Sequence, residues 1–191
     1  RKYGNMLRVG DCPCDILKNR FNAVNLRLTS GKTAVHSDMI MWNMEDSVEN
    51  AALQFTSILY TVPQVSVRVD KLPEDHYKML KFYIDFWKEW REVLLDGKLT
   101  ATNPESEYSI VCSTFENKAV FTAYNDSVIS VKTEIAVAVN ATAKKHLIIK
   151  NAENYSYKVL NCMGEEIANG TIESTLEEIR VPVAGMICLQ K

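Results

Sequence analysis

The sequence predicts an α/β fold joined to an all-β fold: the C-terminal portion of a (β/α)8 barrel over residues 1–97, then an antiparallel β-sandwich over residues 98–191. Three observations predict this. β-Prone runs alternate with helical stripes in the first half. About eight or nine short strand-like runs, separated by turn residues, fill the second half. The change comes near 96–103, where Asp-Gly-Lys gives way to Thr-Ala-Thr-Asn-Pro.

Each predicted helix of the first half follows a predicted strand. The first helix, over 15–30, has apolar residues at helical spacing and is stopped by Gly31. The second and third helices cover 45–60 and 73–95. The strand-like runs before the three helices begin at Met6, Val35 and Pro63. Three strands are too few to close a barrel, so we expect the remaining strands upstream in a longer parent chain, with a small open sheet as the alternative.

The second half has the spacing of an antiparallel sandwich. Turn residues such as Asn125-Asp126 and Asn169-Gly170 separate its strand-like runs. Only 174–178 has helical character. The predicted strands are 108–113, 118–124, 128–131, 134–139, 145–150, 155–161, 166–171, 179–182 and 186–189.

Composition excludes several classes of partner. The net charge is −2, and Lys and Arg form no block, so no nucleic-acid partner is expected. No apolar run approaches the roughly 20 residues that cross a bilayer, so no membrane span is expected. The chain starts without an initiator Met or a signal-peptide pattern, as expected of a piece of a longer protein. The compartment (bacterial cytoplasm, periplasm or exterior) and a homo-oligomeric state are left open.

The cysteines predict neither a disulfide framework nor a metal site. Their number is five, which is odd, and they are not densely spaced. The Cys12-Pro13-Cys14 motif lacks the spacing and the further ligands of a zinc site. We therefore expect no metal and no cofactor, and we interpret Cys12 and Cys14 as two thiols in a tight loop beside a site.

Acidic residues follow the first two predicted strands. Asp11 and Asp38 stand where the active-site residues of α/β barrels lie, just past the carboxyl ends of the strands. With Arg8 nearby, such a carboxylate suits general acid/base chemistry or the binding of a polar ligand. The alternative is structural, with Asp11 capping the next helix and Arg8 on the barrel rim.

These motifs resemble the α-galactosidase clan of glycoside hydrolases, in particular the family of bacterial α-galactosidases and raffinose-synthase-like enzymes. Arg8-Val9-Gly10-Asp11 is followed by His36-Ser37-Asp38-Met39 and then by the change to β structure, in the order found in that family. The resemblance covers the whole chain as the C-terminal part of a larger enzyme. It implies an α-galactoside oligosaccharide as substrate.

Carried over by position, the resemblance implies that Asp11 is the general acid/base carboxylate and Arg8 holds a sugar hydroxyl. Asp38 would accept hydrogen bonds from the galactosyl ring, with Met39 beside it. Cys12 occupies the place where several relatives have the catalytic Asp, and Asp15 is the alternative acid/base. Trp42 is expected either to stack on a sugar or to pack between barrel and helix.

The resemblance implies a retaining double displacement, in which two carboxylates act in turn. The nucleophile of such relatives lies on an earlier strand, in a Lys-x-Asp motif, so the 191-residue chain is expected to hydrolyse nothing by itself. A second hypothesis is a non-catalytic carbohydrate-binding or structural sandwich attached to a degenerate barrel fragment.

Overall fold

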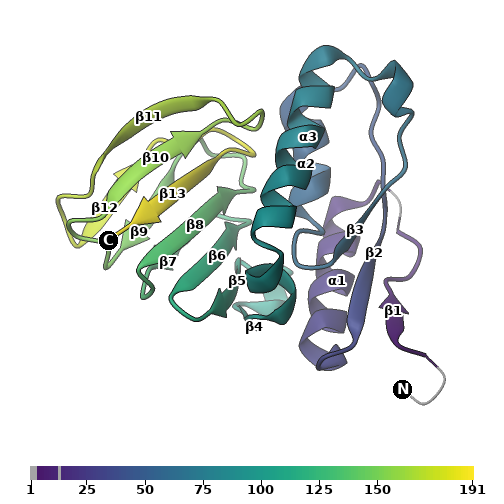
Figure 1. The fold of residues 1–191 in the computed structure, drawn as a ribbon, viewed down its shortest axis with the longest axis horizontal. Coiled ribbons are helices and arrows are strands. Elements are labelled where there is room, and N and C mark those ends of the chain that lie inside the picture. Colours follow the sequence, from purple (N-terminus) through teal and green to yellow (C-terminus); the bar gives the residue numbers. More distant parts are fainter. Residues whose placement is uncertain (1–3, 13) are drawn as a thin grey trace.

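A three-stranded parallel sheet forms the first part of the fold. The computed structural model describes residues 4–12 and 14–191, so Pro13 of the cysteine motif lies outside the described residues. The sheet has the order β1 (Met6–Arg8), β2 (Ala34–Ile40) and β3 (Val62–Val65). Helices α1 (Ile16–Ser30), α2 (Val48–Thr56) and α3 (Glu74–Glu89) follow the strands in turn (Figure 1). The strand–helix alternation is confirmed, but the sheet is open, and no closed barrel forms among the described residues.

Local signals set the ends of the helices. The Asp15 side chain caps α1 by accepting a hydrogen bond from the Lys18 backbone N at 3.0 Å, and Gly31 ends the helix with φ of 60°. Ser47 caps α2 in the same way. The third helix ends earlier than predicted, at Glu89. It is followed by a π-helical turn, η2 (Glu92–Asp96), while a short 3-10 turn, η1 (Val69–Lys71), precedes it.

The second part is a sandwich of two sheets. The larger sheet has the strand order β11-β10-β13-β8-β6-β5-β4, and the smaller has the order β12-β9-β7. The bounds are β4 Lys98–Ala101, β5 Ile110–Phe115, β6 Lys118–Ala123, β7 Val128–Ser130, β8 Ile135–Asn140, β9 Leu147–Lys150, β10 Ser156–Leu160, β11 Glu166–Thr171, β12 Leu176–Ile179 and β13 Met186–Gln190, with a 3-10 turn, η3, at Pro104–Ser106. The predicted boundary at 97/98 falls between η2 and β4.

The antiparallel prediction needs two corrections. β6 pairs with β8 in parallel, and β7 pairs with β9 in parallel. The chain leaves the large sheet after β6, adds β7 to the small sheet and returns as β8, so the strands on either side of that excursion run the same way. The helical prediction for 174–178 is also wrong, because residues 176–178 belong to strand β12, which pairs with β9.

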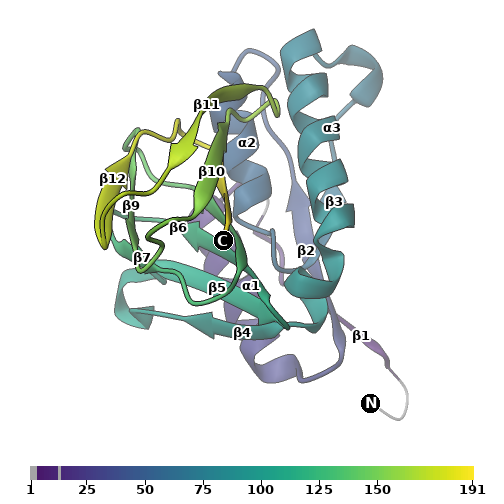
Figure 2. The same ribbon diagram turned by 60° about the vertical axis from the view of Figure 1, so that its left-hand side comes forward.

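The fold has two apolar layers. One lies between the two sheets of the sandwich and contains Ile149 and Ile187. The other lies between the helices and the large sheet, where Phe55 and Tyr83 pack in one cluster with Val137. Figure 2 shows the small sheet on the side of the large sheet away from α2 and α3. The first part of the chain is therefore docked on the sandwich through its helices.

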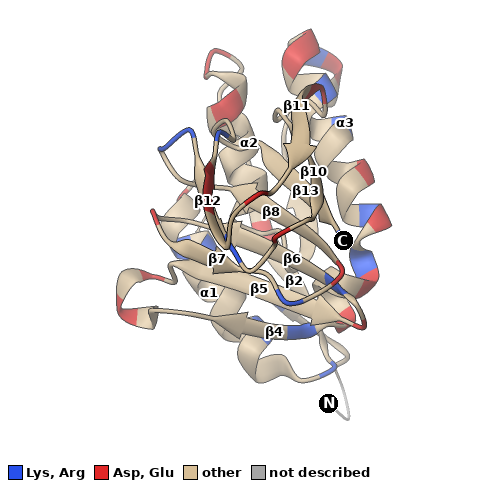
Figure 3. Ribbon diagram, turned by 90° about the vertical axis from the view of Figure 1, so that its left-hand side faces the viewer, with Lys and Arg blue, Asp and Glu red and all other residues tan. Residues whose placement is uncertain are grey.

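Buried tyrosines fix this interface. Tyr60 Oη lies 2.8 Å from the carbonyl oxygen of Val111, and Tyr83 Oη donates to Ala184 O at 2.5 Å. Burial raises the pKa of both phenols well above the ordinary value, so both remain donors. Charges of both signs are spread over the exposed side of α3 (Figure 3). No helix of the described part of the chain is long and apolar enough to span a membrane.

Candidate functional site

The candidate site lies at the carboxyl ends of β1 and β2. Arg8 is the last residue of β1 and is in register with His36 of β2. The pairing of β2 with β3 shifts by one residue between His36 and Met39, which is a β-bulge. The Ser37 hydroxyl accepts the Gln64 backbone N–H at 2.9 Å within this bulge. Because the bulge breaks the alternation of the strand, both Ser37 and Asp38 are buried.

Arg8 joins the two predicted acids. Its Nη2 donates to Asp38 Oδ1 at 2.6 Å, and its Nη1 donates to Asp11 Oδ1 at 3.0 Å. The other oxygen of Asp38 accepts the backbone N–H of Cys12 at 2.5 Å. The Asp38 side chain is fully buried, whereas the Asp11 side chain is 85% exposed. One carboxylate is thus enclosed with both oxygens bonded, and the other faces solvent.

The electrostatics of this cluster follow from those contacts. The hydrogen bond to Asp11, supported by the charges of Asp38 and Asp11, raises the pKa of the Arg8 guanidinium. Burial, followed by the charge of Asp38, raises the pKa of the Cys12 thiol. Cys12 therefore remains a neutral thiol rather than a nucleophile. Its contribution to the site is the backbone N–H that Asp38 accepts.

Asp15, the alternative acid/base, has a structural role here. It caps α1 and forms an ion pair with Lys18 at 3.3 Å. The backbone hydrogen bond from Lys18 lowers the pKa of Asp15. The predicted capping function therefore belongs to Asp15, and Asp11 is left exposed at the mouth of the strands.

Trp42 and Met39 lie near the same end of the sheet. Met39 is half-buried on β2 opposite Gln64. The Trp42 indole donates to His76 Nδ1 at 3.0 Å, and His76 Nε2 lies 3.0 Å from the Asp46 carbonyl oxygen. These contacts fix the Trp42 ring on the wall of a cavity of about 360 Å³ that also includes Cys14.

Sequence reasoning missed two polar residues near the site. Ser37 was not singled out because a bulge leaves no mark in the hydrophobic pattern. Gln54 lies on α2, is only 8% exposed and donates to Cys14 O at 3.4 Å. A glutamine among the apolar positions of a helix was the available signal. Within the described residues, no group of three or more His, Cys, Asp or Glu side chains is arranged to hold a metal ion.

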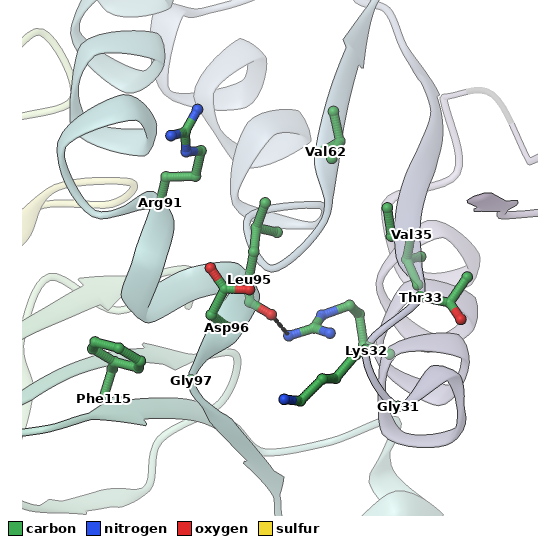
Figure 4. Close-up of a pocket in the computed structure, with 12 residues that line it drawn as sticks. Gly31, Lys32, Thr33, Val35, Val62, Arg91, Leu95, Asp96, Gly97 and Phe115 are labelled. Carbon is green, nitrogen blue, oxygen red and sulfur yellow. Dashed lines mark hydrogen bonds between the residues drawn. The ribbon is translucent and has the colours of Figure 1, made fainter. Parts of the chain in front are cut away.

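A cavity of about 500 Å³ lies at the opposite end of the sheet (Figure 4). Its lining includes Ala34 and Val62, the first residues of β2 and β3. Arg27 lines it too, but its guanidinium donates to the carbonyl oxygens of Tyr60 at 2.9 Å and Leu95 at 2.8 Å. Arg27 therefore ties α1 to the chain before β3 and to η2. In parallel α/β folds this end of the strands serves stability, while sites form at the carboxyl ends.

Comparison with protein-family models and with curated proteins gave no match. Solved structures with weak similarity to this chain include the following two. A xyloglucanase of glycoside hydrolase family 44 from Paenibacillus polymyxa is 12% identical, with 83% of this chain and 32% of that chain covered and a TM-score of 0.39. A bifunctional glucanase-xylanase from a metagenome library is 12% identical, with 98% and 41% covered and a TM-score of 0.38.

The chain thus spans about a third to two fifths of the length of these two carbohydrate-active enzymes. Neither of the two structures is that of an α-galactosidase.

Proposed function

We propose that this chain supplies the general acid/base carboxylate and part of the sugar pocket of a retaining glycoside hydrolase that acts on terminal α-galactosides. One observation carries the proposal: a single guanidinium, that of Arg8, binds the buried Asp38 and the exposed Asp11 at the carboxyl ends of adjacent parallel strands. The buried acid fixes the arginine, and the arginine orients the exposed acid. Asp11 is the proton-transferring group.

The contacts of Asp11 and Asp38 suggest a different role for each acid. Arg8 holds Asp11 through Oδ1, so Asp11 Oδ2 is the oxygen that protonates the glycosidic oxygen and later removes a proton from water. Guanidinium has five N–H donors. Those of Arg8 that bind neither the two acids nor Val9 O, which Nη1 contacts at 3.4 Å, are offered to a sugar hydroxyl. Asp38 has both oxygens bonded, so its role is to position Arg8 and the Cys12 backbone. Because the Asp38 side chain is fully buried, a galactosyl hydroxyl reaches its remaining acceptor sites only if the surrounding chain moves.

The nucleophile is assigned to the rest of the parent chain, about 5–5.5 Å from Asp11 when the barrel is assembled. The free edge of β1 supports this, because Met6 is 53% and Leu7 is 38% exposed there. A cavity of about 570 Å³, lined by Val9 and Leu26 among others, lies beside β1 and α1. A further strand and helix of the parent chain would pair with β1 and fill this space. Met39, Cys12 and Trp42 border the resulting pocket.

The test uses the parent chain with two aryl α-galactosides. Asp11→Asn is expected to lower turnover by about 10²–10⁴-fold with a poor leaving group, which needs protonation, and much less with a good one. Asp15→Asn is the matched control, because it changes a neighbouring carboxylate that caps α1 and should leave both rates nearly unchanged. Equal losses for both substrates, or a larger loss in the Asp15 variant, would reject Asp11 as the acid/base.

A second function has one observation in its favour. Asp11 is 85% exposed on an open surface, which suits a degenerate barrel fragment whose sandwich only binds or supports carbohydrate. In that case the parent chain would not turn over either α-galactoside, while sugar binding would persist in the Asp11→Asn variant.

A further inference from the structure

A small cavity adjoins the candidate site on the side of α2. It measures about 360 Å³, and its lining residues are Cys14, Met41, Trp42, Asn43, Asp46 and Gln54. They come from the loop after β1, the loop after β2 and from α2. These segments meet at the carboxyl end of the sheet, where Arg8 and Asp38 also lie. Trp42, which borders the proposed sugar pocket, also lines this cavity, and the other lining residues have no role in the proposed function.

Gln54 is the unusual group in its wall. Its side chain is more than nine-tenths buried, and its Oε1 has no hydrogen-bond partner among the described residues. Within the described part of the chain, the one hydrogen bond of the Gln54 side chain, from Nε2 to Cys14 O, is long at 3.4 Å and therefore weak. A buried acceptor without a donor is unfavourable. The terminal amide torsion of glutamine is soft, so a small rotation can turn Oε1 to a hydroxyl placed in the cavity.

The rest of the lining suits a neutral polyhydroxylated ring. Trp42 offers an indole face, and its orientation is fixed because its N–H is bonded to His76. Asn43 and Asp46 contribute an amide and a carboxylate from one tight loop, in which Asp46 Oδ2 accepts the Asn43 backbone N–H at 3.1 Å. An aromatic wall with convergent amide and carboxylate groups matches a pyranose, which has an apolar face and a hydroxyl-bearing edge.

The cavity lies within a short distance of Asp11. Asp11 and Cys14 are three residues apart, so their Cα atoms are separated by at most about 11 Å. Two linked pyranose units can span such a distance, so the two places can hold neighbouring units of one oligosaccharide. We propose that this cavity is a second sugar subsite, which binds the unit next to the terminal sugar held by Arg8 and Asp11. The inference rests on the proposed function and assigns the place where the second unit of the oligosaccharide binds.

The experiment titrates the ¹⁵N-labelled chain with galactose and with galactosyl-α-1,6-glucose. The disaccharide is expected to shift the Trp42 indole and Gln54 amide signals and to bind more tightly than galactose. Gln54→Leu should reduce its affinity by about 3- to 10-fold, the value of one hydrogen bond, and leave galactose affinity unchanged. Gln190→Leu, at an exposed position of β13, is the matched control.

The outcomes separate the two proposals. Disaccharide-dependent shifts at Trp42 and Gln54 support the subsite whether or not galactose alone binds. Absence of those shifts, or equal disaccharide affinity in the Gln54→Leu variant and the wild type, overturns the subsite. Absence of shifts at the Asp11 and Cys12 amides with either sugar counts against the proposed function instead. Folding of the variant is checked by its unfolding midpoint, because leucine removes both the unbonded Oε1 and the weak hydrogen bond from Nε2 to Cys14 O.

Discussion

Replacing Asp38 with alanine should destabilise the fold far more than replacing Asp11 with asparagine. Asp38 is fully buried and accepts the buried backbone N–H of Cys12 at 2.5 Å. Alanine leaves that N–H without an acceptor, and hydrogen bonds to ionised groups are worth about 1.5–3 kcal/mol. The Arg8 side chain is 40% exposed, so water can replace Asp38 as its hydrogen-bond partner. We therefore add no loss of stability for the broken ion pair between Arg8 and Asp38. The expected loss for Asp38→Ala is therefore about 1.5–3 kcal/mol.

The assay is urea unfolding followed by tryptophan fluorescence. The midpoint for Asp38→Ala should fall with an unchanged slope, which marks a loss of stability and not a change in the exposed surface. Asp38→Asn retains one acceptor oxygen and should lose less. Asp11→Asn, at an 85% exposed side chain, should unfold close to the wild type. Equal midpoints for Asp38→Ala and Asp11→Asn would refute the claim that the buried acid anchors the site.

Two further predictions concern the frame around the site. Gly97→Ala should cost about 1–3 kcal/mol or more, because a Cβ there would lie 2.3 Å from Val93 O and 2.9 Å from Thr114 O, whereas Gly4→Ala meets nothing within 4 Å and should be neutral in the same urea assay. The lowered pKa of Asp15 means that its contribution to stability is complete at neutral pH and is lost as the pH falls through that lowered value, below the ordinary 3.8. Asp15→Asn keeps the cap without the charge, so its midpoint should fall less than that of the wild type between neutral pH and about pH 3; an equal fall would contradict the assignment.

Sequence reasoning found those elements whose signals are local. The first helix was predicted because Asp15 and Gly31, its cap and its stop, are readable in the sequence. The strand at Leu176–Ile179 was missed because its two glutamates favour a helix, and only pairing with β9 makes it a strand. The parallel pairing of β6 with β8 depends on β7 joining another sheet, which no local pattern reports.

The candidate site, too, was predictable where the signal is local and not where it depends on the tertiary structure. The rule that strand ends converge placed Arg8, Asp11 and Asp38 together, and the structure has them in one hydrogen-bonded group. The rule did not distinguish the two acids. Their difference arises from the one-residue bulge in β2, which buries Asp38, and from the cap taken by Asp15, which leaves Asp11 in solvent. Each of these two features depends on the position of a single residue, which the hydrophobic pattern of the sequence does not report.

The loop between β1 and α1 explains why an exposed acid can still be well placed. Val9 N donates to His36 O at 3.0 Å, Cys12 N donates to Asp38, and Cys14 O accepts from Gln54. Asp11 stands between the first two of these ties, so its backbone is held on both sides while its carboxylate stays in solvent. An acid/base group must donate a proton in one step and remove one in the next, which requires a fixed backbone and an oxygen that is free to exchange. In the proposed function these two requirements favour Asp11 over Asp38, which has both oxygens bonded, and over Asp15, which is engaged by Lys18.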